Sequence, residues 1–122
     1  MSLEQKVLDI TRNADAAITI GQILKATATG CDVATANTDI LLGVAMTNAA
    51  AGEMVTVRVL GIARVQASAA ITLGDRVTAT TAGQAVTTTT DKQTIIGRAL
   101  EAATAQNDLI AVFLTPGITL SL

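Results

Sequence analysis

The chain has 122 residues, a formal net charge of −2, one Phe, one Cys and no His, Trp or Tyr. Without His there is no imidazole base or imidazole metal ligand, and a single Cys forms neither an internal disulfide nor a thiolate zinc site. Eight basic and ten acidic residues with one aromatic side chain also leave no electrostatic or stacking signature of nucleic-acid binding. The length fits one domain with a short terminal arm.

Residues 1–13 carry two conflicting patterns. A capping-box spacing and a shared helical face for Leu3, Val7 and Ile10 indicate a helix. Residues 7–12 also alternate between apolar and polar side chains, which favours a strand. We predict a first strand preceded by a mobile arm. The start of the chain lacks the basic and apolar regions of a secretory signal, so synthesis in the cytoplasm is expected.

Glycines punctuate the chain, and the first seven recur every 9 to 13 residues, with runs rich in Thr, Val and Ile between them. This spacing is typical of a meander of short strands. In residues 54–60, Val55, Val57 and Val59 fall on one face of a strand and polar side chains on the other. The longest apolar stretch, residues 109–114, is far shorter than the roughly 20 residues of a membrane helix. The sequence therefore predicts an all-β fold.

The glycine spacing recurs because the sequence contains an internal repeat. Residues 18–30 (ITIGQILKATATG) align with residues 71–83 (ITLGDRVTATTAG) at an offset of 53. Residues 40–59 align with residues 94–114 once small gaps are allowed. The chain therefore contains two copies of one unit, each with four short strands.

These patterns predict a simple domain organisation. Residues 1–13 form an N-terminal arm or first strand, and residues 14–122 form a single β domain. Within that domain the first repeat covers about 14–60 and the second about 67–114. Two such units closing on each other predict a small β-barrel or β-sandwich with pseudo-two-fold symmetry and few exposed edges.

Few residues are suited to catalysis or metal binding. Most acidic residues lie beside turns, where carboxylates cap backbone N–H groups, and no calcium-loop run is present. Cys31 follows a predicted turn with nothing beside it to activate the thiol, so we interpret it as a small structural residue. We predict no catalytic residue, no metal, no cofactor and no enzymatic activity. A small hydrolase or isomerase would require a clustered pair of carboxylates.

One segment has a rival interpretation. Asp91 and Lys92 follow a run of Thr, and swinging-arm carrier domains of the lipoyl or biotinyl type present a modifiable Lys after Asp at a hairpin tip. Those domains are also small pseudo-symmetric β-sandwiches. A solvated loop lysine explains the segment as well, so a carrier domain with Lys92 as the modified residue is the alternative function.

Arginines in strand-like runs are the candidates for contacts between chains. Arg58, Arg64, Arg76 and Arg98 are suited to ion pairs with a neighbouring subunit or partner, and ordinary surface charge explains them equally well. The apolar residues are mostly Ala, Val, Ile and Leu, which bury less surface than aromatic residues. Association with further chains would therefore add stability.

Three segments resemble a known family. Residues 43–61 (GVAMTNAAAGEMVTVRVLG), residues 69–77 (AAITLGDRV) and residues 96–103 (IGRALEAA) are similar, in order and spacing, to the tailed-bacteriophage capsid cement (decoration) proteins. The resemblance extends over residues 14–114. Its motifs are turn and packing patterns that carry no chemistry.

The resemblance implies a small all-β protein without catalytic activity that binds the outer surface of the expanded phage head. It implies homotrimers that bridge neighbouring major capsid proteins, with no nucleic acid, membrane or small-molecule substrate as partner. An N-terminal arm that becomes ordered on the capsid is a further hypothesis, and we predict selective binding to the expanded shell. The candidate residues for contact with the capsid or a neighbouring subunit are Leu3, Val7, Arg12, Arg58, Arg64, Arg76 and Arg98.

Overall fold

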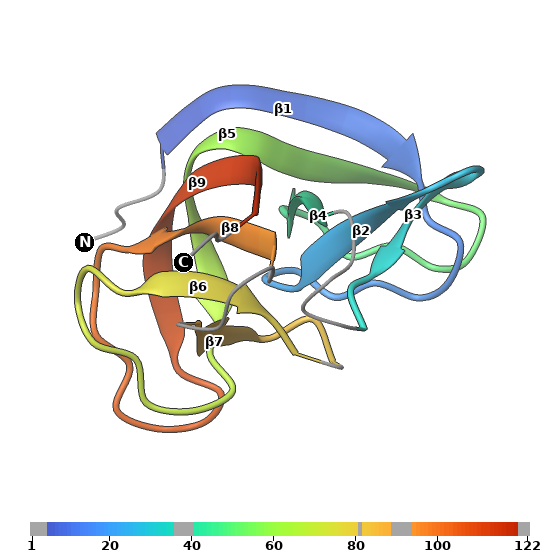
Figure 1. The fold of residues 1–122 in the computed structure, drawn as a ribbon. Coiled ribbons are helices and arrows are strands. Elements are labelled where there is room, and N and C mark those ends of the chain that lie inside the picture. The colour runs from blue at the N-terminus through green and yellow to red at the C-terminus, as the bar shows by residue number, and fades with distance from the viewer. Residues whose placement is uncertain (1–4, 36–40, 81, 89–93, 120–122) are drawn as a thin grey trace.

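The computed structural model describes residues 5–35, 41–80, 82–88 and 94–119. Within these ranges the chain forms strands and no helix, so the predicted all-β fold class is confirmed (Figure 1). No helix among these residues is long and apolar enough to cross a membrane. The strands are β1 (Gln5–Asn13), β2 (Ile23–Thr27), β3 (Gly30–Val33), β4 (Leu41–Ala45), β5 (Met54–Gln66), β6 (Arg76–Ala79), β7 (Ala85–Thr87), β8 (Thr94–Ala99) and β9 (Leu109–Thr119).

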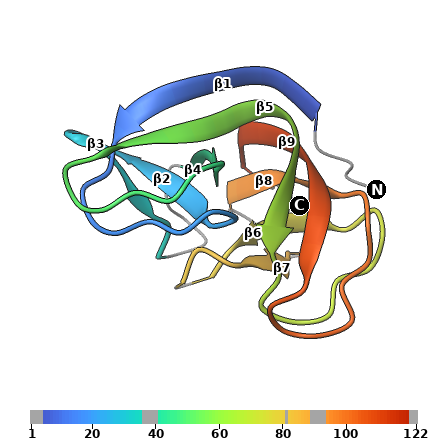
Figure 2. The ribbon, with the colours of Figure 1, turned by 180° about the vertical axis from the view of Figure 1, so that it is seen from behind.

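The strands form one curled sheet. Its order is β3-β2-β4-β5-β9-β8-β6-β7, every named pair is antiparallel, and β1 pairs with β5 outside this path. The sheet curves into a half-barrel (Figure 2). The curl brings the turn before β7 back against β2, where the Ile23 N–H donates to the Gly83 carbonyl at 2.7 Å. The barrel-like architecture is therefore made by a single sheet that bends on itself.

Strand β5 connects all parts of the sheet. It pairs with β1 along one edge, and Val57 and Arg58 pair at the same time with β4. Gly61 and Ile62 likewise pair with both β1 and β9. Because a strand has only two edges, β4 and β9 share the second edge of β5. Gly61 has a φ of 118°, a conformation that favours glycine, and it lies where β9 pairing begins.

The N-terminal segment is a strand from Gln5 onward, as predicted. Strand β1 pairs with β5 from Gln5 opposite Ile62 to Asn13 opposite Met54, with irregular register on both sides of Leu8. Residues 1–4 lie outside the described part of the chain. The hypothesis of an arm that becomes ordered on the capsid therefore stays a prediction.

The strand order is symmetric about the β5–β9 pair. Strands β3, β2, β4 and β5 on one side correspond to β7, β6, β8 and β9 on the other. Isolated bridges recur at offsets of 53 and 54 residues: Ala14 bridges Cys31 in parallel, as Ala67 bridges Ala85. The antiparallel bridge of residues 18 and 49 likewise recurs at residues 71 and 103. These contacts follow the alignment of the two sequence units, whose boundaries stay a prediction.

Two apolar clusters lie inside the sheet. The smaller cluster is made by the first unit and includes Cys31, Leu24 and Val57, with Ile10 of β1 packed against it. The larger cluster contains most of the buried apolar side chains of the second unit and also Ile23, Leu41 and Val44 of the first unit. The first unit is therefore anchored in the core of the second. Both clusters consist of aliphatic side chains and Ala, with one Cys.

Two glycines permit neighbouring strands to approach closely. A Cβ at Gly43 would collide with the carbonyl oxygen of Arg58, and a Cβ at Gly97 would collide with the carbonyl oxygen of Phe113. Neither glycine has a positive φ, so space and not backbone conformation requires Gly at these positions. They occupy corresponding positions in β4 and β8, beside β5 and β9.

We expect G97A to lower the free energy of unfolding by about 3 kcal/mol, because an added methyl group must displace backbone atoms. The matched control is G52A, since Gly52 has a φ of 86° and nothing within 4 Å of an added Cβ. G52A should lower stability by only about 1 kcal/mol. Chemical denaturation measures both values, and equal losses would contradict the steric explanation.

One buried hydroxyl provides a second test. Thr78 is 1% exposed, and its Oγ1 has no hydrogen-bond partner among the described residues. T78V keeps the shape of the side chain and removes the unsatisfied oxygen, so we expect it to raise the free energy of unfolding by about 1 kcal/mol. T87V is the control, because the Thr87 hydroxyl donates to Asp75 at 2.8 Å and its loss should not stabilise. Denaturant titration of both variants would detect the difference.

Candidate functional site

The described carboxylates stabilise turns. Asp15 accepts hydrogen bonds from the hydroxyls of Thr27 at 2.6 Å and Thr29 at 2.7 Å, and these bonds lower its pKa. Asp108 accepts bonds from the backbone N–H and hydroxyl of Thr104, which lower its pKa in the same way. The described ranges contain no group of three His, Cys, Asp or Glu side chains that could hold a metal ion. Absence of enzymatic activity stays a prediction.

Cys31 lies in the smaller core cluster with no exposed surface. Burial raises the pKa of the thiol, and the negative charge of Asp15 raises it further. A buried thiol with a raised pKa is a poor nucleophile at neutral pH. The structure thus agrees with the interpretation of Cys31 as a small core residue.

Arg58 is used inside the molecule. Its Nε donates to the Asp9 carboxylate at 2.9 Å, and its Nη1 donates to the Ile62 carbonyl at 3.0 Å. The Arg58 side chain is only 11% exposed. This partly buried pair joins β1 to β5, which favours an internal role for Arg58 over a contact with another chain.

The other predicted contact residues lie at different places on the surface. Val7 is 70% exposed at the bulge of β1, and Arg12 borders a hollow of ≈ 310 Å³ near the opposite end of that strand, where it donates to the Gly30 carbonyl at 3.4 Å. Arg64 borders a hollow of ≈ 150 Å³ together with the apolar side chains of Ile20 and Leu109. Leu3 lies outside the described residues. The structure does not bring these residues together.

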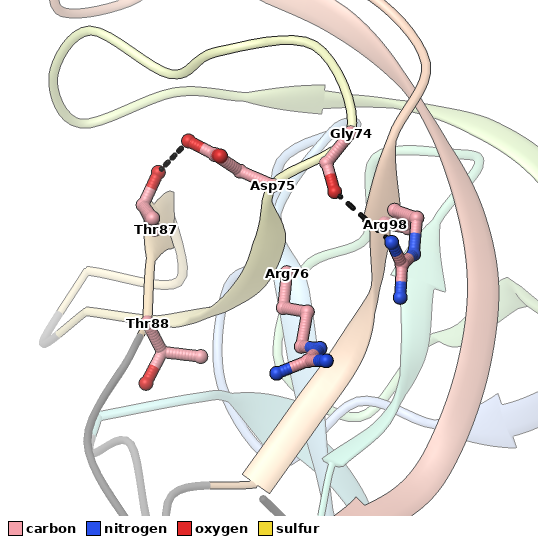
Figure 3. Close-up of a pocket in the computed structure, with 6 residues that line it drawn as sticks. All are labelled: Gly74, Asp75, Arg76, Thr87, Thr88 and Arg98. Carbon is pink, nitrogen blue, oxygen red and sulfur yellow. Dashed lines mark hydrogen bonds between the residues drawn. The ribbon is translucent and has the colours of Figure 1, made fainter.

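Arg76 and Arg98 do come together. They are direct partners on β6 and β8, and both border a hollow of ≈ 250 Å³ with Gly74, Asp75, Thr87 and Thr88. Arg98 donates to the Gly74 carbonyl at 3.4 Å, whereas Asp75 accepts from the Thr87 hydroxyl (Figure 3). In this view the Asp75 carboxylate points away from both guanidinium groups (Figure 3). The hollow therefore presents two cations on one open face.

An exposed aromatic side chain is absent from the predicted contact residues. Phe113, the single aromatic residue, is 49% exposed on β9, next to Arg98 of β8. A signal for this position exists in residues 109–114, because strict alternation with the buried Val112 and Leu114 places Phe113 on the outer face. The signal was masked because every residue from 109 to 114 is apolar.

Comparison with known proteins decides the family. The family model of the phage cement protein matches residues 3–114, which is most of the chain. The chain belongs to the phage cement protein family. No curated protein matches the sequence.

A solved structure shares the fold of this cement protein. The N base of the head fibre gp8.5 of bacteriophage phi29 is similar with a TM-score of 0.70 and 22% sequence identity. The similarity covers 88% of this chain and 93% of that chain. At this identity the likeness shows a common all-β fold.

Membership of the cement protein family sets the coarse function. The chain is a structural protein of a bacteriophage, located on the capsid of the virion, with a capsid cement or decoration role. The carrier interpretation receives no support from the family or from the similar structure. Lys92 itself lies outside the described residues.

The two perturbed carboxylates predict a dependence of stability on pH. Because Asp15 and Asp108 have pKa values below the ordinary 3.8, their hydrogen bonds stabilise the fold above that pH. This contribution is lost as the pH falls through the lowered values. We expect the melting temperature of the wild type to exceed that of D15N/D108N at about pH 5, and the difference to shrink as the pH falls below the ordinary 3.8. A difference that stays constant in calorimetry across this range would contradict the prediction.

Proposed function

We propose that this cement protein binds the outer surface of the expanded phage head and bridges neighbouring major capsid proteins, so that the shell resists internal pressure. The family match over residues 3–114 is the observation that carries the proposal. That range includes all strands of the sheet except the end of β9. The role is thus assigned to the folded domain as a whole.

The chemistry of the described surface supports a non-enzymatic role. Its carboxylates are used in turns and in the pair with Arg58, and its hollows are open. A bridging protein needs several contacts of modest affinity, because simultaneous binding multiplies their effect. We include in the proposal a homotrimer, synthesised in the host cytoplasm, since a symmetric oligomer supplies such contacts from one chain.

The proposal includes selective binding to the expanded shell. A protein that binds one of two shell states more tightly shifts the equilibrium toward that state. Binding to the expanded head in preference to the precursor would therefore stabilise the mature form. Equal affinity for both states would not shift the equilibrium and would contradict this part of the proposal.

Quantitative mass spectrometry of purified phage particles tests the proposal. We expect about one copy of this chain for each copy of the major capsid protein, as in a symmetric surface lattice. Particles from a phage without the gene should release DNA at lower temperature, and addition of the purified chain should restore the wild-type value. Absence of the chain from the particles would overturn the proposal.

A further inference from the structure

A row of four side chains crosses the sheet of the second unit. Ile62 on β5 pairs with Phe113 on β9, Phe113 pairs with Arg98 on β8, and Arg98 pairs with Arg76 on β6. Direct cross-strand partners lie on the same face of a sheet. We name these four residues the Arg76–Phe113 face. Phe113 and both arginines are exposed, and Ile62 is partly buried.

The first unit has a corresponding row of four residues, which differs in its burial. Asp9 pairs with Arg58, Arg58 with Val44, and Val44 with Ile23, in the same register from strand to strand. Val44 and Ile23 are fully buried, because they belong to the core cluster of the second unit. The second unit thus covers Val44 and Ile23 of the first unit, whereas the corresponding residues of the second unit are exposed.

The open row is unfavourable for an isolated chain. Like charges directly opposite each other on neighbouring strands destabilise a sheet, and Arg76 and Arg98 are such a pair. Asp75 lies beside them, but its carboxylate accepts a bond from the Thr87 hydroxyl at 2.8 Å (Figure 3). It also accepts one from the Thr72 N–H at 3.0 Å. Arg76 has no side-chain hydrogen bond or ion pair within the described residues. The two cations therefore favour a carboxylate other than those of the described residues.

The described part of a second copy is a poor source of that carboxylate. Each acidic side chain in the described ranges already accepts a hydrogen bond within the chain. These residues are Asp9, Asp15, Asp32, Glu53, Asp75, Glu101 and Asp108. Pairing across copies would compete with these turn and strand contacts. The complementary acid is better supplied by a different protein.

We propose that the Arg76–Phe113 face is a docking surface for an acidic segment of the capsid subunit. A carboxylate of that segment binds between Arg76 and Arg98 in the ≈ 250 Å³ hollow, and an adjacent apolar side chain packs on Phe113 and Ile62. Aromatic and Arg side chains are the residues that most often dominate protein interfaces. This inference rests on the proposed capsid-binding function and identifies the surface that performs it.

Binding of fluorescently labelled chain to expanded heads that lack it tests the inference. We expect R76E/R98E to weaken binding about 100-fold and F113A to weaken it about 30-fold. K25E is the control, because Lys25 is a cation on β2 that is not among the predicted contact residues, and its Nζ donates to the Thr35 hydroxyl at 3.2 Å. It should change affinity less than about threefold. Higher salt should weaken the wild type more than R76E/R98E.

Each outcome separates this inference from the proposed function. Heads that do not bind the wild-type chain would refute the function itself. Wild-type binding with unchanged affinity of R76E/R98E and F113A would refute only the docking surface. Loss of self-association by R76E/R98E in light scattering, with capsid affinity retained, would assign the surface to a second copy and overturn the inference. The melting temperature of each variant controls for folding, and R98E alone replaces any variant that fails to fold.

Discussion

The fold depends on a single strand that serves both halves of the molecule. One edge of β5 pairs with β1, and its other edge pairs first with β4 and then with β9. Pairing of one strand with three neighbours forces the sheet to diverge, and the divergence occurs close to Gly61. The larger core cluster fills the curl that results. Apart from this shared strand, the two units are joined by side-chain packing in the larger cluster and by hydrogen bonds such as that from the Ile23 N–H to the Gly83 carbonyl.

The sequence predicts the strands of this fold better than it predicts which strands pair with each other. Alternation of Val55, Val57 and Val59 identifies β5, and the same rule extends to Ala63 and Val65. The rule does not reveal that the strand continues through Gly61, because glycine interrupts the pattern. Nor does it show which strands share an edge of β5, since that depends on contacts far apart in the sequence.

Arg58 and Arg98 show that the sequence around a residue does not determine its partner. Arg58 and Arg98 both come from strands and have an apolar residue on each side or a glycine on one. Arg58 is neutralised because Asp9 lies opposite it, 49 residues away in sequence, whereas Arg98 lies opposite a second arginine. Only strand register distinguishes a structural cation from an available one. The resemblance to cement proteins could be predicted from motif order, but the location of a contact surface could not.

Divergence of the two units gives the second unit an exposed face that is suited to the proposed docking. An apolar row on the second unit, like Val44 and Ile23 on the first, would leave an exposed hydrophobic surface prone to self-association. Arginine at the same positions keeps that face hydrated until an acidic partner neutralises it. Phe113 then adds apolar contact area that becomes buried only on docking. Because the affinity of one such face is modest, the strength of attachment depends on how many faces bind the shell at once.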